Sequence, residues 1–219
     1  MGVSSMLNVL KKNNPDIEFY SVFDTEFETF GKVFDINTSE ILSFGDNIEV
    51  PEGISYLPSV EDFENMCIAR ELENEFYGSL PIQVGLCMGH STMMNATEWH
   101  TSNEINIAIT DLVLILGHRW DIHNDKIDSS LFKAFYVPKG TVVEVFSTSL
   151  HYCPCQVNDA GFKCVVVLPK DTNTAVETEV LDKRITAKNK WLIAHVENEA
   201  KIKQGAVAGI TGINYEIKY

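Results

Sequence analysis

Apolar residues change their spacing along the chain, and the change separates a mixed first third from a β-rich middle. Residues 58–78 carry apolar side chains at helical spacing, from Val60 to Phe76. Ser59 stands at the start of this pattern as a candidate N-cap, and Gly78 ends it. A capping residue before an apolar stripe and a glycine after it are typical of a helix, so we expect one helix here.

From residue 81 onward the apolar positions form short runs rich in β-branched residues, with turn-forming stretches between them. We expect each run to be a strand, because no helical pattern intervenes. Several short strands with turns between them favour a sandwich or a small barrel. The runs are residues 81–87, 105–117, 133–138, 141–148 and 162–169.

The pattern of the last fifty residues predicts a helix and, after it, a loop and a strand. Residues 182–202 have the spacing of a helix, and residues 205–219 are typical of a loop followed by a strand. No linker, repeat or low-complexity segment divides the chain, so we expect a single domain. Its expected parts are N-terminal helix and strand additions over 1–80, a barrel core over 81–170 and a C-terminal extension over 171–219.

The charge of the chain narrows the classes of partner. The 219 residues include 17 Lys and Arg against 31 Asp and Glu, which gives a formal net charge of −14. Such a charge repels phosphate backbones and anionic membrane surfaces, and the apolar runs are far shorter than the roughly 18 residues that span a bilayer. Five cysteines in apolar contexts fit buried thiols in a reducing compartment. We therefore expect a cytoplasmic protein that binds neither nucleic acid nor a membrane.

Two carboxylates and an imidazole, Glu98, His100 and Glu104, stand together just ahead of the longest apolar run. Residues two apart on a strand face the same side, so Glu98 and His100 would point inward while Trp99 points away. Glu104 joins them if the chain turns before the next strand begins. His151, from a neighbouring strand, would be the fourth member of the group.

Two imidazoles and two carboxylates form a mixed nitrogen and oxygen donor set suited to Mn, Ni, Zn or Fe. Carboxylates that face each other inside a barrel repel unless a cation or protons intervene, and a divalent ion would resolve that repulsion. We therefore predict a metal site made of Glu98, His100, Glu104 and His151. The alternative stays open that the carboxylates are solvated and His100 is an ordinary core or surface histidine, because E-x-H-x-x-x-E is a short pattern.

Two further residues are candidates for proton transfer. Glu144 lies among apolar residues, and a buried carboxylate needs a partner. It could be a general base, a metal ligand in place of Glu98, or the partner of a lysine such as Lys133. His90 follows two glycines on an expected loop, where it could contact a substrate at the barrel mouth or be a turn histidine.

Three other candidates stay open in the second half of the chain. His195 could close over the site together with Lys190, or it could be a histidine at a helix end. Cys153 and Cys155 form C-x-C beside His151. A structural zinc site usually needs another such pair, so we interpret both cysteines as small apolar wall residues.

At these residues the sequence resembles the cupin superfamily, whose first motif is G-x5-H-x-H-x3,4-E-x6-G. The segment EWHTSNE matches H-x-H-x3-E, with Glu98 in place of the first histidine. The phrase PKG resembles the second motif, G-x5-P-x-G-x2-H, and His151 arrives eleven positions after Gly140 rather than three. The resemblance implies a mainly β fold, namely a cupin-type double-stranded β-helix barrel with helical N-terminal additions and a C-terminal extension.

Two segments, residues 26–34 and 128–155, also resemble the ureidoglycolate lyase family. Over nearly its full length the chain is most similar to an uncharacterised bacterial family of cupin-like proteins. That likeness lies in GHSTMMNATEWHTSNEINIA, FYVPKGTVVEV, LHYCPC and KNKWLIAH. It implies a fold and no established reaction.

The cupin resemblance implies a metal-dependent enzyme that acts on a small polyhydroxylated or carboxylated metabolite. Several cupins of this size and ligand type are sugar aldose–ketose isomerases, so we expect that reaction, with Glu144 and His90 as the proton shuttle. The alternatives are an enzyme like ureidoglycolate lyase and a non-catalytic sugar-binding or regulatory cupin. Since cupins often pair through strand edges, and exposed edges need covering, we also expect a homodimer.

Overall fold

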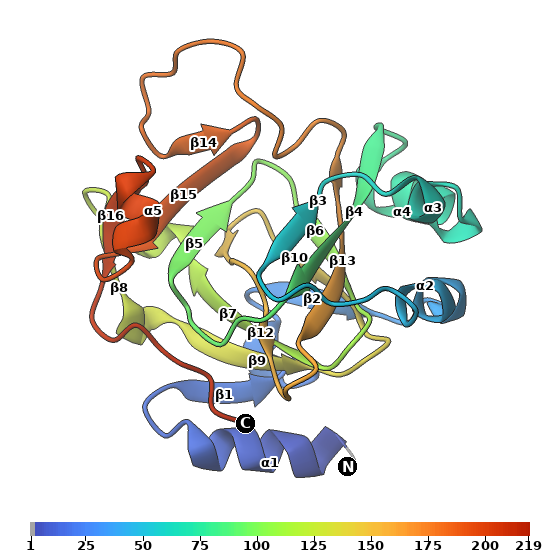
Figure 1. Cartoon of the computed structure of the whole chain (residues 1–219), viewed down its shortest axis with the longest axis horizontal. Coiled ribbons are helices and arrows are strands. Elements are labelled where there is room, and N and C mark those ends of the chain that lie inside the picture. The colour runs from blue at the N-terminus through green and yellow to red at the C-terminus, as the bar shows by residue number, and fades with distance from the viewer. Residues whose placement is uncertain (1–2) are drawn as a thin grey trace.

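The computed structural model describes residues 3–219, and β-strands make up most of its core (Figure 1). Two sheets face each other and enclose an apolar interior, while helices and a third sheet cover their outer faces. The mainly β fold class is therefore confirmed. None of the helices in this part of the chain is long and apolar enough to cross a membrane.

The first sheet has the strand order β1–β9–β7–β11, and β12 also pairs with β7. Strand β1 runs parallel to β9, whereas the other pairs are antiparallel. The strands are β1 (Glu18–Ser21), β7 (Leu112–His118), β9 (Lys133–Val137), β11 (Ser149–Leu150) and β12 (Cys155–Gln156).

The second sheet has the order β2–β10–β6–β13–β4–β3, and every neighbouring pair in it is antiparallel. Its strands are β2 (Gly31–Phe34), β3 (Ser55–Leu57), β4 (Ile82–Gly89), β6 (Glu104–Ala108), β10 (Val142–Val145) and β13 (Phe162–Pro169). All five sequence runs from residue 81 to residue 169 therefore contain strands, as predicted. Strands β1, β2 and β3 from the first third of the chain join the two sheets as well.

Side-chain alternation explains how the two sheets build an interior. On β7, Leu112 and Leu114 face the second sheet, and on β13, Cys164 and Val166 face the first. The intervening residues face outward, so each strand is apolar on both sides. Strand β6 departs from this pattern, because its inward positions near the start are polar. This break in the apolar lining places the candidate site inside the barrel.

Helices cover the outer face of the second sheet (Figure 1). The expected single helix over 58–78 is two helices, α3 and α4, and Gly78 ends α4 in the left-handed conformation with φ of 57°. Ser59 does not cap a backbone N–H; its hydroxyl donates to the Glu64 side chain at 2.7 Å. The helices on this face are α2 (Ser39–Gly45), α3 (Glu61–Glu64) and α4 (Cys67–Tyr77).

The first sheet is covered on its outer face by helix α1 (Val3–Asn13) and by a third sheet. The C-terminal segment meets the end of α1 there, since Asn14 and Lys218 exchange hydrogen bonds at 2.8 Å. Short 3-10 helices η1 (Thr25–Phe27), η2 (Arg119–Asp121) and η3 (Ser129–Leu131) connect the strands elsewhere.

The prediction of a helix over residues 182–202 is wrong. This segment forms the hairpin β14 (Ile185–Ala187) and β15 (Lys190–His195), followed by the short helix α5 (Glu199–Lys203). Asn189 turns the hairpin with φ of 56°, a left-handed conformation that asparagine tolerates better than most residues. The third sheet has the order β14–β15–β16–β8, and β5 pairs with β15. Its other strands are β5 (Ala96–Trp99), β8 (Ile127–Asp128) and β16 (Val207–Thr211), the last within the predicted loop and strand over 205–219.

Candidate metal centre

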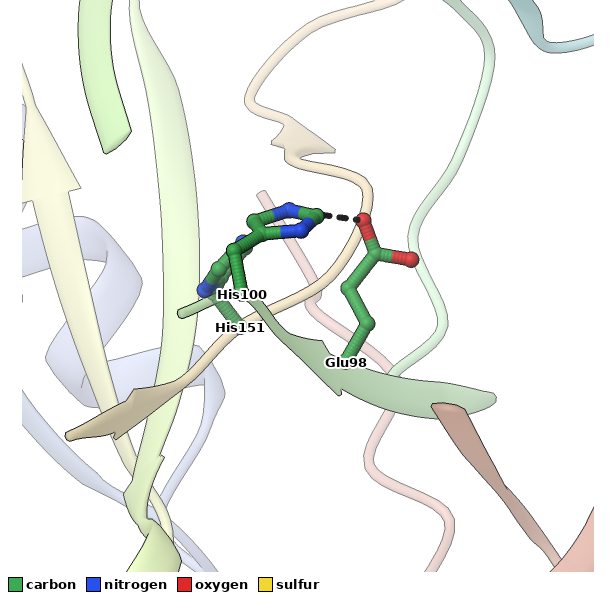
Figure 2. A group of neighbouring side chains, drawn as sticks. All are labelled: Glu98, His100 and His151. Carbon is green, nitrogen blue, oxygen red and sulfur yellow. Dashed lines mark ion pairs between the residues drawn. The ribbon is translucent and has the colours of Figure 1, made fainter. Parts of the chain in front are cut away.

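Strand β5 sets the direction of the first two site residues. Trp99 lies opposite Trp191 of β15, and their rings stack with centroids 6.4 Å apart on one side of the sheet. Because side chains alternate along the strand, Glu98 and His100 point to the other side, as predicted from their spacing. Figure 2 shows both side chains rising from this strand toward the interior.

His151 reaches the same place through a short antiparallel bridge to β5. The Glu98 N–H donates to the His151 carbonyl at 2.6 Å, and the His151 N–H donates to the Glu98 carbonyl at 3.0 Å. The two imidazole rings lie 5.3 Å apart, centroid to centroid (Figure 2). Backbone pairing, rather than sequence proximity, thus brings residue 151 beside residue 98.

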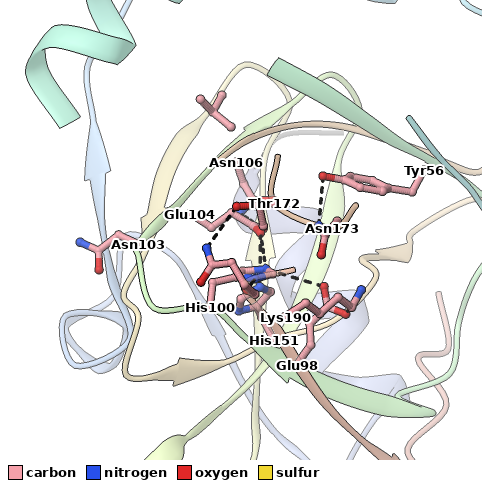
Figure 3. A network of polar contacts seen from close by, with 12 residues as sticks. Tyr56, Glu98, His100, Asn103, Glu104, Asn106, His151, Thr172, Asn173 and Lys190 are labelled. Carbon is pink, nitrogen blue, oxygen red and sulfur yellow. Dashed lines mark hydrogen bonds and ion pairs between the residues drawn. The ribbon is translucent and has the colours of Figure 1, made fainter. Parts of the chain in front are cut away.

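Glu104, the first residue of β6, lies between the two imidazoles. Its Oε2 is 3.3 Å from His100 Nε2 and 3.4 Å from His151 Nε2. Its Oε1 accepts a hydrogen bond from Asn106 Nδ2 at 2.9 Å (Figure 3). The structure therefore brings together all four residues, Glu98, His100, Glu104 and His151, that the sequence singled out as candidate ligands, and each is buried.

Both imidazoles are oriented with Nε2 toward the cluster. His100 Nδ1 lies 2.7 Å from the Asn189 carbonyl oxygen, to which it donates, and His151 Nδ1 lies 3.4 Å from the Ser149 carbonyl oxygen. A ring that donates through Nδ1 keeps a lone pair on Nε2, which is the usual arrangement of a metal-bound histidine. Neither buried Nε2 atom has a hydrogen-bond partner among the residues that the structure describes.

Electrostatics also favour a cation at this point. Burial alone would raise the pKa of Glu104, but the facing His151 and His100 imidazoles hold it well below its ordinary value. Burial alone would lower the pKa of His151, yet the Glu104 and Glu98 carboxylates raise it. Without a metal, a proton on the His151 imidazole offsets part of the carboxylate charge, and a divalent ion would supply positive charge in its place.

The donor separations fit a shared ion. Two donors that each lie about 2.1 Å from an ion, at an angle of about 90–109°, are roughly 3.0–3.4 Å apart. The separations from Glu104 Oε2 to the two imidazole nitrogens, 3.3 and 3.4 Å, match this range. One ligand atom each from Glu98, His100 and His151 also lies within 4.8 Å of the others. The cluster is thus suited to a metal ion, and two histidines with one carboxylate would leave coordination positions open.

Glu98 has a second partner that sets it apart from Glu104. Lys190 Nζ lies 2.5 Å from Glu98 Oε2, while Glu98 Oε1 is 3.9 Å from His100 Nε2. The lysine comes from the start of β15, which pairs with β5 (Figure 3). Glu98 therefore lies at the edge of the cluster, held between an ammonium group and an imidazole.

His195 does not join Lys190 at the site. It is fully buried on β15, where its Nε2 lies 3.2 Å from the Gly212 carbonyl oxygen and its Nδ1 accepts from the Glu197 N–H at 3.2 Å. Both ring nitrogens are satisfied. It is a core histidine on a strand and not one at a helix end.

Glu144 and His90 lie outside the cluster. Glu144 is opposite Ile105 on β6, and residues opposite each other in an antiparallel pair share a face. That face packs under the helices, where Glu144 Oε1 accepts from Asn103 Nδ2 at 2.8 Å. His90 is exposed after β4. Neither residue lines the cavity of the site, so the proton shuttle predicted on them has no geometric support.

A cavity of about 220 Å³ opens on the cluster. Its wall includes Cys153, whereas Cys155 is buried in the core. Burial raises the pKa of the Cys155 thiol to about 12, which disfavours a zinc thiolate. The polar residues that line the cavity are Tyr56, Glu98, Glu104, Asn106, His151, Tyr152, Asn173, Lys190 and Lys201.

Sequence reasoning missed the residues that support the ligands. Asn106 lies within an apolar run and so does not stand out as a site residue. Its spacing of two from Glu104 nevertheless places both residues on one strand face. Asn189 falls within the segment whose spacing predicts a helix, and no glycine marks the hairpin that it turns with φ of 56°. Its side-chain oxygen accepts from the Thr101 N–H at 2.9 Å and so fixes the loop after His100.

Two facing sheets closed around inward-pointing imidazoles and carboxylates define a mainly β protein with a candidate metal centre. The chain belongs to the family described as Domain of unknown function (DUF4867), whose model matches residues 19–215. No curated protein matches the chain.

Solved structures similar to the chain include oxalate decarboxylase from Bacillus subtilis and the protein CapF. A mutant of the decarboxylase is 17% identical, with 57% of this chain and 27% of that chain covered and a TM-score of 0.35. A structure of the same enzyme from a study of its Mn(II) centres is 16% identical, with 63% of this chain and 30% of that chain covered and a TM-score of 0.34. The structure of CapF with the inhibitor 3-isopropenyl-tropolone is 20% identical, with 40% of this chain and 24% of that chain covered and a TM-score of 0.32. The matched part spans less than a third of each of these relatives.

Proposed function

We propose that the protein is a metal-dependent enzyme that acts on a small polyhydroxylated or carboxylated metabolite, as a sugar aldose–ketose isomerase. The observation that carries the proposal is the convergence of His100 Nε2 and His151 Nε2 on one oxygen of Glu104, at 3.3 and 3.4 Å. The cavity beside this cluster gives a small molecule access to it.

His100, Glu104 and His151 would hold the divalent ion, with Mn, Ni, Zn and Fe as the candidates. Such an ion polarises a carbonyl oxygen and the neighbouring hydroxyl oxygen, which makes the hydrogen on the intervening carbon more acidic. Asn106 and the Asn189 carbonyl keep two of the ligands in orientation through hydrogen bonds of 2.9 and 2.7 Å.

Glu98 is the proposed proton shuttle. Its carboxylate takes the proton from the carbon next to the carbonyl and returns it to the former carbonyl carbon. The hydroxyl proton passes at the same time from its own oxygen to the former carbonyl oxygen, so that an aldose becomes a ketose without net gain or loss of atoms. Lys190, 2.5 Å from Glu98 Oε2, holds the carboxylate in place. General acid–base catalysis of this kind contributes roughly 10²–10⁴-fold.

A turnover screen tests the proposal. The protein loaded with Mn²⁺, Ni²⁺, Zn²⁺ or Fe²⁺ should convert at least one aldose into its ketose, and Glu98→Gln should lose roughly 10²-fold or more of that rate while retaining the metal. Glu144→Gln is the matched control, because it makes the same change on the outer face of the sheet. Its rate should equal that of the wild type.

Other outcomes of the screen distinguish the alternatives. Turnover of ureido or hydroxy acids, with no sugar converted, would replace the isomerase with a lyase. Sugar binding without turnover under every metal would assign a binding or regulatory role instead.

A further inference from the structure

The cavity of the candidate metal centre shares part of its wall with a second cavity farther out. The inner cavity has a volume of about 220 Å³ and the outer one about 330 Å³. Four residues line both of them, namely Tyr56, Asn173, Lys190 and Lys201. We call these four residues the doorway. A molecule that reaches from the outer cavity to the cluster must pass them, so their chemistry bears on which molecules enter.

Tyr56 and Asn173 give the doorway one free donor and one free acceptor. Asn173 Nδ2 donates to the Tyr56 hydroxyl oxygen at 3.2 Å (Figure 3). Within residues 3–219 the Tyr56 hydroxyl donates no hydrogen bond of its own. Asn173 Oδ1 is buried, and no donor reaches it in the same part of the chain. A buried acceptor without a partner costs stability, and a ligand hydroxyl between these two atoms would satisfy both.

Lys201 adds a positive charge that no carboxylate balances. It is half-buried on α5, and it forms no ion pair within the described residues. Lys190, the other doorway lysine, pairs with Glu98, and the neighbouring Lys203 pairs with a glutamate at 2.8 Å. In a chain of net charge −14, an unpaired ammonium at the entrance of a cavity supplies a local positive charge that can attract an anion.

We propose that the doorway is a subsite for the anionic end of a polyhydroxylated substrate, so that the natural substrate is an acidic sugar. Lys201 pairs with a carboxylate or phosphate group, Tyr56 and Asn173 hold a hydroxyl, and the carbonyl end lies toward His100, Glu104 and His151. This inference names the substrate class for the proposed isomerase and rests on it. The net charge of the molecule disfavours an anion, but an ammonium in direct contact with it outweighs surface charges that lie beyond the Debye length. The Glu98 carboxylate in the inner cavity is already paired with Lys190.

Binding measurements on the metal-loaded full-length protein test the subsite without any need for turnover. Three probes of similar length are titrated by calorimetry: D-gluconate, which carries a carboxylate, D-glucose 6-phosphate, which carries a phosphate, and neutral D-glucitol. At least one anion should bind about tenfold more tightly than D-glucitol, as expected for hydrogen bonds to a charged group. The tighter anion identifies whether a carboxylate or a phosphate is the natural group.

Variants of α5 assign the preference to one residue. Lys201→Gln should weaken binding of the preferred anion about tenfold and leave D-glucitol unchanged, whereas Lys201→Arg should keep the preference. Lys203→Gln, two residues away on the same short helix and exposed, is the matched control and should change nothing. Equal affinities for all three probes, no binding of any of them, or an unchanged preference in Lys201→Gln would overturn the proposal.

The outcomes separate this inference from the proposed function. An anion preference that depends on Lys201, found together with no isomerisation, keeps the subsite and removes the isomerase. Isomerisation of neutral sugars with no such preference keeps the isomerase and removes the subsite.

Discussion

Asn106 Nδ2 donates a hydrogen bond of 2.9 Å to Glu104 Oε1, two residues away on the inward face of β6. The bond occupies one oxygen of the carboxylate and leaves Oε2 facing the two imidazoles. Asn106 Oδ1 in turn accepts from Cys164 Sγ at 3.2 Å. Glu104 is therefore oriented by a small buried network before any ion binds.

Removing the amide should weaken metal binding. Asn106→Leu keeps the volume of the side chain but leaves Glu104 Oε1 without its donor, so affinity for a divalent ion should fall about 10–100-fold, as is typical for residues that orient ligands. Competition with a fluorescent chelator measures the change. Asn47→Leu, an exposed position after α2, is the control. Equal affinities for Asn106→Leu and the wild type would contradict the orienting role of Asn106.

Metal should stabilise the protein more at alkaline than at acidic pH. The facing carboxylates raise the pKa of His151 above its ordinary value of 6.5, so the protonated imidazole stabilises the metal-free fold below pH 6.5. That contribution is lost as the pH rises through the raised pKa. The lowered pKa of Glu104 keeps its carboxylate charged over the same range. A divalent ion replaces the imidazole proton without competition at high pH.

Thermal unfolding with and without metal measures this linkage. The increase in Tm on adding Zn²⁺ or Mn²⁺ should be larger at about pH 8.5 than at about pH 6. A metal-induced increase that is the same at both pH values, or larger at pH 6, would show that the ion does not compete with the proton on His151.

Lys190 should matter for turnover more than for metal binding. Lys190→Met removes the ammonium group that lies 2.5 Å from Glu98 Oε2 and leaves His100, Glu104 and His151 in place. We expect stoichiometric metal and a turnover rate about 10²-fold lower, the size of a lost general acid–base contribution. Lys188→Met, which removes an exposed ion pair on the same hairpin, should have little effect on either. Loss of the metal in Lys190→Met would mean that the lysine supports the ligands instead.

One prediction concerns the fold alone. The Lys163 ammonium on β13 is buried and donates to the carbonyl oxygens of Gly45 at 2.6 Å and Ile48 at 3.0 Å, at the end of α2. Lys163→Met leaves these carbonyls unpaired and should lower the free energy of unfolding by about 3 kcal/mol. Urea denaturation measures it, with the exposed Lys170→Met as control. A loss below about 0.5 kcal/mol, the range of ordinary surface changes, would refute the account.

The strand content was predictable because dense β-branched runs have few other stable arrangements. The run over 105–117 nevertheless differs from the single strand that we expected, since it contains two strands, β6 and β7, which belong to different sheets. The turn between them is set by Asp111, whose Oδ1 accepts from the Lys139 N–H at 2.7 Å. Such a long-range contact leaves no mark on the apolar pattern.

The grouping of Glu98 with His100 followed from alternation alone, because only one strand is involved. Alternation could not tell which face of β10 carries Glu144, since its neighbours on both faces of that strand are valines. Lys190 became visible only when the hairpin β14–β15 replaced the expected helix, because its place beside Glu98 depends on the pairing of β15 with β5. Contacts between strands that lie far apart in the sequence were thus beyond the reach of local patterns.

An anomalous-scattering map from a crystal grown with Mn²⁺ or Zn²⁺ is the most direct test of the central claim. It should show an ion about 2.0–2.2 Å from His100 Nε2, His151 Nε2 and Glu104 Oε2, and the peak should vanish in Glu104→Ala. An ion bound elsewhere, or no peak at these three atoms at saturating metal, would contradict the claim that they share a divalent cation.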